Sequence, residues 1–192
     1  MAKKYEFKPD KPRSGWLTRL HLTQLQRRAL LKWSLYGLVL LVLSVLQDVI
    51  LCRFSLYGAT TELVPCGIFL ICLLEGSERG SVFALVASLL YLFSGTAPGP
   101  YAMVSIIILA VVMTAFRQGY LQKGFSAAML CTGVAMVVYE LAVFAIGLFL
   151  GLTLPSRLTG FLITAALTML AAPILYSLLL SIGTIGGETW KE

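Results

Sequence analysis

The chain has 192 residues, of which 58% are apolar and only 12% are charged, and its mean hydropathy is +0.88. A water-soluble fold of this length cannot bury so much apolar surface, so the composition excludes the usual soluble classes and predicts a membrane protein. The net charge of +6 does not indicate nucleic-acid binding, because nine of the fifteen Lys and Arg residues lie within the first 32 positions. No basic module with interleaved aromatic residues accompanies them.

Residues 1–29 are polar and basic, and they precede the first apolar segment. A basic segment in this position orients a membrane protein and contacts anionic lipid headgroups, so we expect a cytoplasmic tail. Within it, residues 14–28 carry leucines and a tryptophan among basic residues, which is compatible with a short interfacial helix.

Apolar segments separated by short polar turns make up the rest of the chain. They lie at about 30–51, 63–74, 81–94, 101–116, 125–152 and 158–182. The second and third are short for a bilayer crossing, and the polar turn 75–80 separates them. The sequence therefore predicts an all-α fold, a polytopic membrane bundle of about six transmembrane helices over residues 30–183. Residues 184–192 form a short cytoplasmic C-terminal tail.

The charged residues agree with this topology. With six crossings and a cytoplasmic N-terminus, thirteen Lys and Arg residues fall on the inner side, whereas only Arg53 and Arg157 fall on the outer side. Such an excess follows the positive-inside rule, although the tail contributes most of it.

Ionisable residues within apolar segments are costly and mark functional sites. Glu140 is the most deeply placed, and three interpretations stay open for it: a hydrogen bond between helices, a proton or ligand site, or a contact with a partner. Gln47 and Asp48 lie near the outer interface, where solvation or a role at a helix end explains them. The candidate partner or ligand contacts are Gln47, Asp48, Glu62, Glu75, Glu78, Arg79 and Glu140.

We find none of the common catalytic motifs in the sequence. The single histidine, His21, lies outside the apolar body, so a Ser-His dyad, a zinc site of the HExxH type and a haem ligand pair cannot form within it. There is no phosphate-binding loop, and the four cysteines occur singly in apolar surroundings, which is typical of packing residues. We expect no enzyme, no cofactor and no metal site.

Several motifs in a fixed order resemble the MreD family of bacterial rod shape-determining membrane proteins. They are LQD at residues 46–48, FSLYG at 54–58, LVP at 63–65, LEGSERGSVF at 74–83 and APILY at 172–176. The resemblance covers about residues 35–185 in organisation. The chain departs from the family where a Gly-rich third helix ending in Asp is common, since Ala84, Ser88 and Tyr91 stand in that stretch, and it resembles a divergent member.

The resemblance implies a non-enzymatic scaffold of the cell-elongation machinery in the bacterial inner membrane, with both termini cytoplasmic. Its implied partners are an MreC-like protein, the MreB filament and peptidoglycan synthases, besides membrane lipids. MreD-like proteins are also similar in fold to the substrate-binding subunits of energy-coupling-factor vitamin transporters. The alternative function is therefore such a transporter subunit, for which short spans interrupted by Gly and Pro are also typical.

Overall fold

The computed structural model describes residues 24–53, 59–120 and 124–186. Within them the chain forms six α-helices, and no strand. The helices are α1 Gln24–Val49, α2 Leu63–Glu75, α3 Ser77–Phe93, α4 Pro100–Tyr120, α5 Phe125–Phe149 and α6 Leu158–Gly183. Short 3-10 turns follow α1 at Leu51–Arg53, precede α6 at Pro155–Arg157 and follow it at Thr184–Gly186. The predicted all-α bundle of six helices is thus confirmed.

Several boundaries differ from the prediction by a few residues: α4, for example, continues to Tyr120, and α5 ends at Phe149. Helix α1 begins at Gln24, inside the segment assigned to the tail, because the helical conformation continues through the basic residues ahead of the apolar run. The predicted turn 75–80 is only one residue long: Gly76, with φ of 91°, separates α2 from α3. Its positive φ favours glycine and reverses the chain, and residues 78–80 belong to the first turn of α3. Of the predicted interfacial helix 14–28, residues 24–28 belong to α1, and residues 14–23 lie outside the described residues, as does the motif 54–58.

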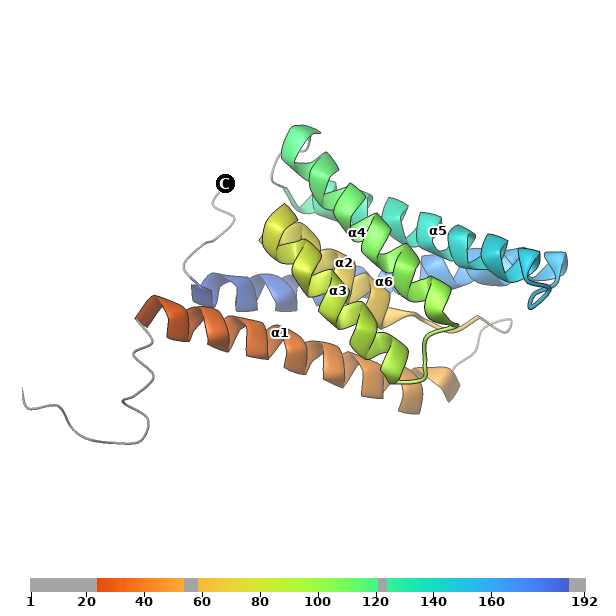
Figure 1. Ribbon diagram of the computed structural model, residues 1–192, viewed down its shortest axis with the longest axis horizontal. Coiled ribbons are helices and arrows are strands. Elements are labelled where there is room, and N and C mark those ends of the chain that lie inside the picture. The colour runs from red at the N-terminus through yellow and green to blue at the C-terminus, as the bar shows by residue number, and fades with distance from the viewer. Residues whose placement is uncertain (1–23, 54–58, 121–123, 187–192) are drawn as a thin grey trace, which may run out of the picture.

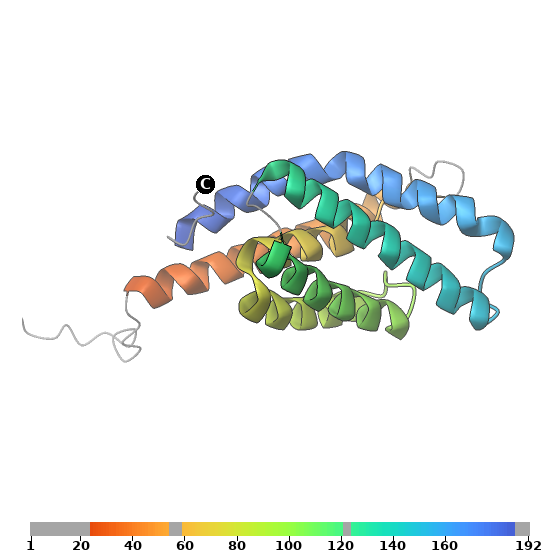
Figure 2. The same cartoon turned by 90° about the horizontal axis from the view of Figure 1, so that it is seen from above.

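Helix α2 lies in the middle of the bundle and contacts all five other helices (Figures 1 and 2). Eleven of its thirteen residues are buried. A helix that is apolar on every side is stable only when protein or lipid surrounds it completely, and here protein does so. Its thirteen residues extend about 20 Å, less than the thickness of the hydrocarbon core of a bilayer.

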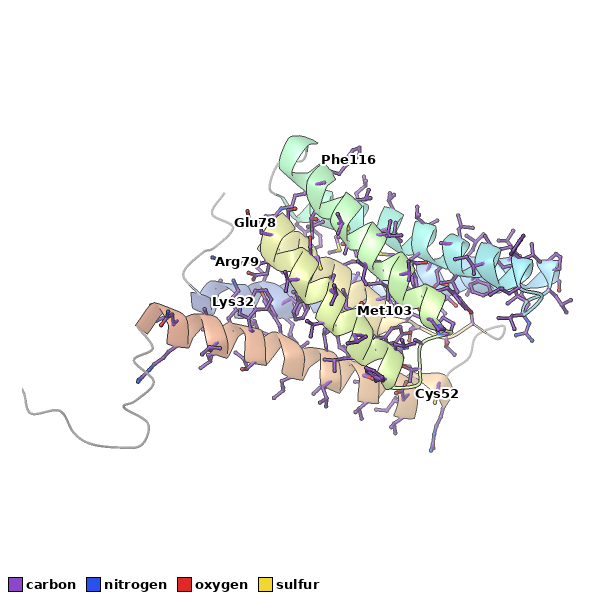
Figure 3. All side chains as sticks on the ribbon, viewed as in Figure 1. Lys32, Cys52, Glu78, Arg79, Met103 and Phe116 are labelled. Atoms are coloured by element: carbon purple, nitrogen blue, oxygen red, sulfur yellow. The ribbon has the colours of Figure 1, made fainter. Side chains whose placement is uncertain are left out.

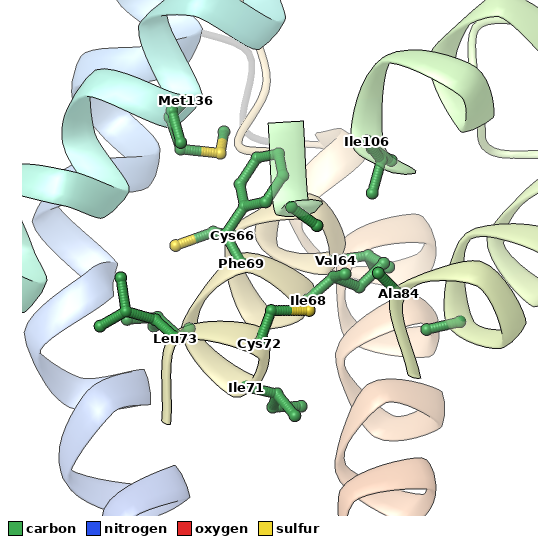
Figure 4. Packing of buried hydrophobic residues seen from close by; sticks show 14 of the residues in the cluster. Val64, Cys66, Ile68, Phe69, Ile71, Cys72, Leu73, Ala84, Ile106 and Met136 are labelled. Atoms are coloured by element: carbon green, nitrogen blue, oxygen red, sulfur yellow. The ribbon is translucent and has the colours of Figure 1, made fainter. Parts of the chain in front are cut away.

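The core is built around the side chains of α2 (Figure 4). Cys66, Phe69 and Cys72 are fully buried. Phe69 packs edge-on against Tyr139 of α5, with ring centroids 6.2 Å apart. In the close view, Ile106 and Met136 approach α2 from the neighbouring helices.

The outer helices present an apolar surface. Four of the described helices, α1, α4, α5 and α6, are long and apolar enough to cross a membrane. Their outward side chains are exposed leucines, valines and phenylalanines, for example Phe149 at 91% and Leu170 at 77% exposure. This pattern of an apolar exterior around an apolar core fits a protein solvated by lipid.

Gly80 allows α2 and α3 to approach closely. A Cβ atom at this position would lie 2.8 Å from the carbonyl oxygen of Cys72 and 3.0 Å from its Cα, both backbone atoms that cannot move aside. We predict that Gly80→Ala lowers the free energy of unfolding in detergent by about 1–3 kcal/mol, the usual cost of overpacking.

Gly37→Ala is the matched control, because a Cβ on this helical glycine of α1 meets nothing within 4 Å. This control is expected to keep or slightly raise the melting temperature, since alanine favours the helix. Equal melting temperatures for the two variants would contradict the close packing of α2 on α3.

Candidate functional site

The C-terminal end of α2, which we call the inner end after the expected topology, carries a buried ion pair. The Nζ atom of Lys32, on α1, lies 2.6 Å from Oε1 of Glu75, the last residue of α2, and the two side chains are only 6% and 4% exposed. The Tyr36 hydroxyl donates a second hydrogen bond of 2.9 Å to the same oxygen. A buried charge pair survives only when its geometry is good and further hydrogen bonds support it, as they do here.

Arg117 of α4 and the linking residue Gly76 satisfy carbonyl groups at the same helix end. The Arg117 guanidinium of α4 donates a hydrogen bond to the carbonyl oxygen of Leu73. The amide of Gly76 donates to the carbonyl of Cys72 at 3.0 Å. A cation at a helix C-terminus both fills the unpaired carbonyls and interacts favourably with the helix dipole.

The N-terminal end of α2, which we call the outer end after the expected topology, is capped by side chains from other helices. The amide of Val64 donates to Oε1 of Gln47 on α1 at 3.1 Å. The amide of Glu62 donates to the Thr168 hydroxyl of α6 at 3.0 Å, and that hydroxyl donates to the carbonyl of Thr164. Glu62 occupies the N-cap position of α2 but its side chain makes no capping hydrogen bond. Its carboxylate is therefore left for other contacts.

A pocket of about 440 Å³ opens beside this outer end. Glu62 and Glu140 both line it, so the fold brings together two carboxylates that are 78 positions apart in the sequence. Oε2 of Glu62 and Oε1 of Glu140 are buried and have no hydrogen-bond partner in the part of the chain that the structure describes. The exposed residues Ser156, Arg157 and Thr159 lie on its other side.

A second, larger cavity of about 790 Å³ runs between α1 and α3. We call it the lateral groove. Its lining residues are mostly apolar, namely Trp33, Gly37, Leu40, Leu41, Ser44, Val64, Glu78, Arg79, Val82, Phe83, Val86, Ala87, Leu90, Tyr91 and Ser94. Val64 belongs to α2, so the groove reaches the central helix. Figure 3 shows Glu78 and Arg79 near Lys32, at the end of the bundle opposite Cys52.

The seven residues predicted as partner or ligand contacts fall into separate places. Glu75 belongs to the inner ion pair, and Glu78 and Arg79 lie exposed at the start of α3, at one end of the lateral groove. Gln47 caps α2, and the neighbouring Asp48 is half-buried near the end of α1. Glu62 and Glu140 meet in the outer pocket.

Four residues of these sites are not among the contacts predicted from the sequence: Lys32, Tyr36, Arg117 and Thr168. Lys32 counts among the basic residues that orient the chain, although its position inside the apolar segment 30–51 is a signal of burial. Arg117 directly follows a predicted span, and Thr168 carries no signal because threonine is ordinary in membrane helices.

Breaking the inner ion pair tests its role in stability. We predict that Lys32→Met lowers the free energy of unfolding in detergent by about 3–5 kcal/mol, because it leaves the Glu75 carboxylate buried without its cation. The double variant Lys32→Met/Glu75→Met is expected to recover most of this loss, since two apolar side chains can replace a buried pair.

Glu78→Gln is the control at the same end of the bundle, because Glu78 is exposed and its loss should change stability by less than about 0.5 kcal/mol. Additive losses in the double variant, measured in a double-mutant cycle, would show that the two side chains are not coupled.

Comparison with known proteins gives no relative: no protein family, no curated protein and no solved structure matches the chain. The resemblance to the MreD family therefore stays a prediction from the sequence motifs. The groove, the pocket and the two ends of α2 are the structural features that bear on function.

Proposed function

We propose that this chain is a non-enzymatic membrane scaffold that holds a transmembrane helix of a partner protein in the lateral groove. The observation that carries the proposal is the shape of this groove. Its α3 wall consists of residues 78, 79, 82, 83, 86, 87, 90, 91 and 94, the spacing of one continuous helix face. These positions extend about 24 Å along the helix, most of the thickness of a bilayer core.

Small residues in the groove favour a helix as its occupant. Gly37, Ser44 and Ala87 line it, and a Cβ atom on Gly37 would meet nothing within 4 Å. Membrane helices associate where small side chains let their backbones approach closely, because lipid supplies no hydrophobic driving force between them.

The charges at the inner end of the groove favour a protein over an anionic lipid. Glu78 and Arg79 are adjacent and of opposite sign. A site for anionic headgroups usually presents several cations together, whereas a pair of opposite charges suits the mixed charges that flank a transmembrane helix of a protein.

The sequence motifs indicate which machinery the scaffold serves. By their resemblance to the MreD family, we propose that the partner helix belongs to an MreC-like protein and that the MreB filament and peptidoglycan synthases join the same elongation complex. We also propose the bacterial inner membrane as the location, with both termini cytoplasmic. In support, the start of α1 and the end of α6 lie at the same end of the bundle (Figure 1), and the basic tail precedes α1.

The outer pocket favours a second function, the substrate-binding subunit of an energy-coupling-factor type vitamin transporter. It offers two carboxylates in a volume suited to a small molecule. Purified protein that retains a vitamin-sized ligand and associates with energy-coupling subunits would favour this second function over the scaffold.

Blocking the groove tests the scaffold directly. We predict that an MreC-like protein encoded in the same genome co-purifies with the tagged chain from detergent-solubilised membranes. Gly37→Phe is expected to reduce its recovery about tenfold or more, because the new side chain fills the groove that the partner helix needs.

Leu170→Phe, at an exposed position of α6 away from the groove, is the matched control and should leave recovery unchanged. A photoreactive amino acid at Leu41, which is exposed in the groove, should cross-link to the partner, and the same group at position 170 should not. Equal recovery with both variants, or cross-linking only from position 170, would refute the groove as the docking site.

A further inference from the structure

The outer pocket contains a pair of carboxylates that the docking of a helix in the lateral groove does not use. Glu140 projects from the middle of α5 and is 1% exposed, and Glu62 is brought beside it at the start of α2. Both carboxylates line the same pocket. Each of them has one buried oxygen without a hydrogen-bond partner among the described residues.

No cation among the described residues pairs with either of these carboxylates. Tyr139 lies beside Glu62, but its hydroxyl makes no hydrogen bond of normal geometry with a described residue. Arg157 is the one cation among the described residues that line the pocket, and it is exposed on the α6 side, where it forms no described ion pair with either carboxylate. Two neighbouring buried carboxylates need a positive charge or a proton that the described residues do not supply, because their desolvation and mutual repulsion are otherwise uncompensated.

The inner end of α2 illustrates what such a carboxylate requires. Glu75 has Lys32 at 2.6 Å and the Tyr36 hydroxyl at 2.9 Å. Glu62 and Glu140 have the same need at the other end, but no lysine reaches them among the described residues. What faces them is the pocket of about 440 Å³.

The remaining walls define the shape of an occupant. Pro98, Val143 and Phe161 supply apolar surface, while Ser156 and Thr159 supply hydroxyl groups toward the exposed side. Among the described residues, no group of three or more His, Cys, Asp or Glu side chains could hold a metal ion directly. A cationic head on a small apolar body matches a carboxylate pair surrounded by Val143 and Phe161.

We propose that the outer pocket binds a small organic cation, an amine or amidine with a short apolar body, whose nitrogen lies between the carboxylates of Glu62 and Glu140. The charged nitrogen donates hydrogen bonds to the unpartnered oxygens, and its body lies against Pro98, Val143 and Phe161. This site is independent of the lateral groove and of the scaffold function.

A pair of probes that differ in charge but hardly in shape tests the proposal. Benzamidine is a planar cation that can donate to two carboxylates, and benzamide is its neutral counterpart. We expect benzamidine to raise the melting temperature of the purified full-length protein in detergent and to bind saturably in calorimetry. We expect benzamide to do neither.

Variants then locate the binding. Glu140→Gln and Glu62→Gln should each weaken benzamidine binding about tenfold or more, because each removes one charged hydrogen-bond acceptor. Glu78→Gln, an exposed change outside the pocket, should leave the affinity unchanged. Thr159→Trp gives a second route should a Gln variant fold poorly, since this exposed residue lines the pocket and a bulky side chain there should block entry.

Several results would overturn the proposal: no saturable binding of benzamidine, equal binding of benzamide, or unchanged affinity in Thr159→Trp together with the Gln variants that fold. Because the measurement uses the purified chain alone, a lack of benzamidine binding would not count against the docking of a partner helix in the lateral groove. Conversely, the Gly37→Phe variant should bind benzamidine normally even where it no longer recovers the partner, because Gly37 does not line the outer pocket.

Discussion

The burial of α2 is the constraint on which the rest of the structure depends. A helix leaves four amides unpaired at its start and four carbonyls at its end, and inside a membrane protein no bulk water is available to bind them. Because five other helices surround α2, its polar ends have to be satisfied by side chains from those helices. Gln47 and Thr168 do this at one end, and Arg117 does it at the other.

The carboxylates at the two ends of α2 lie in different surroundings. At the inner end, Glu75 is matched by Lys32 and Tyr36, so the charge is enclosed and compensated within the chain. At the outer end the backbone is capped, yet the carboxylates of Glu62 and Glu140 face an open pocket. A compensated buried charge holds helices in register, whereas an uncompensated one beside a cavity is the usual mark of a binding site.

The enclosed position of α2 contributes to two cavities, the lateral groove and the outer pocket. Because α2 fills the centre, α1 and α3 need not pack tightly against each other, and the lateral groove lies between them with Val64 of α2 among its lining residues. The polar N-terminus of the same helix supports the outer pocket. The proposed docking of a partner helix and the proposed binding of an organic cation therefore use different sides of one architecture.

Much of this fold could be predicted from the sequence, because bilayer-length apolar segments and short polar turns are local features. The segment 63–74 was identified as short, and it is α2. That five helices enclose it could not be predicted, because every helix here is apolar on most sides and periodicity does not distinguish a lipid-facing side from a buried one. The sites could not be predicted because each joins residues that are far apart in the sequence. Lys32 pairs with Glu75, 43 positions away, and Glu62 lines the same pocket as Glu140, 78 positions away. Glu62 and Glu140 could each be singled out from the sequence, but their meeting in one pocket could not be predicted.

The native cysteines allow the most direct test of the enclosed helix. Cys66 and Cys72 lie on α2 and are fully buried, Cys131 on α5 is half-buried, and Cys52 after α1 is exposed. Labelling of the unmodified protein in mild detergent with N-ethylmaleimide, followed by peptide mass spectrometry, gives the rate at each thiol. An enclosed α2 predicts rapid labelling of Cys52, slower labelling of Cys131, and labelling of Cys66 and Cys72 only after denaturation in sodium dodecyl sulfate. Labelling of Cys66 and Cys72 in the folded protein as fast as that of Cys52 would contradict it.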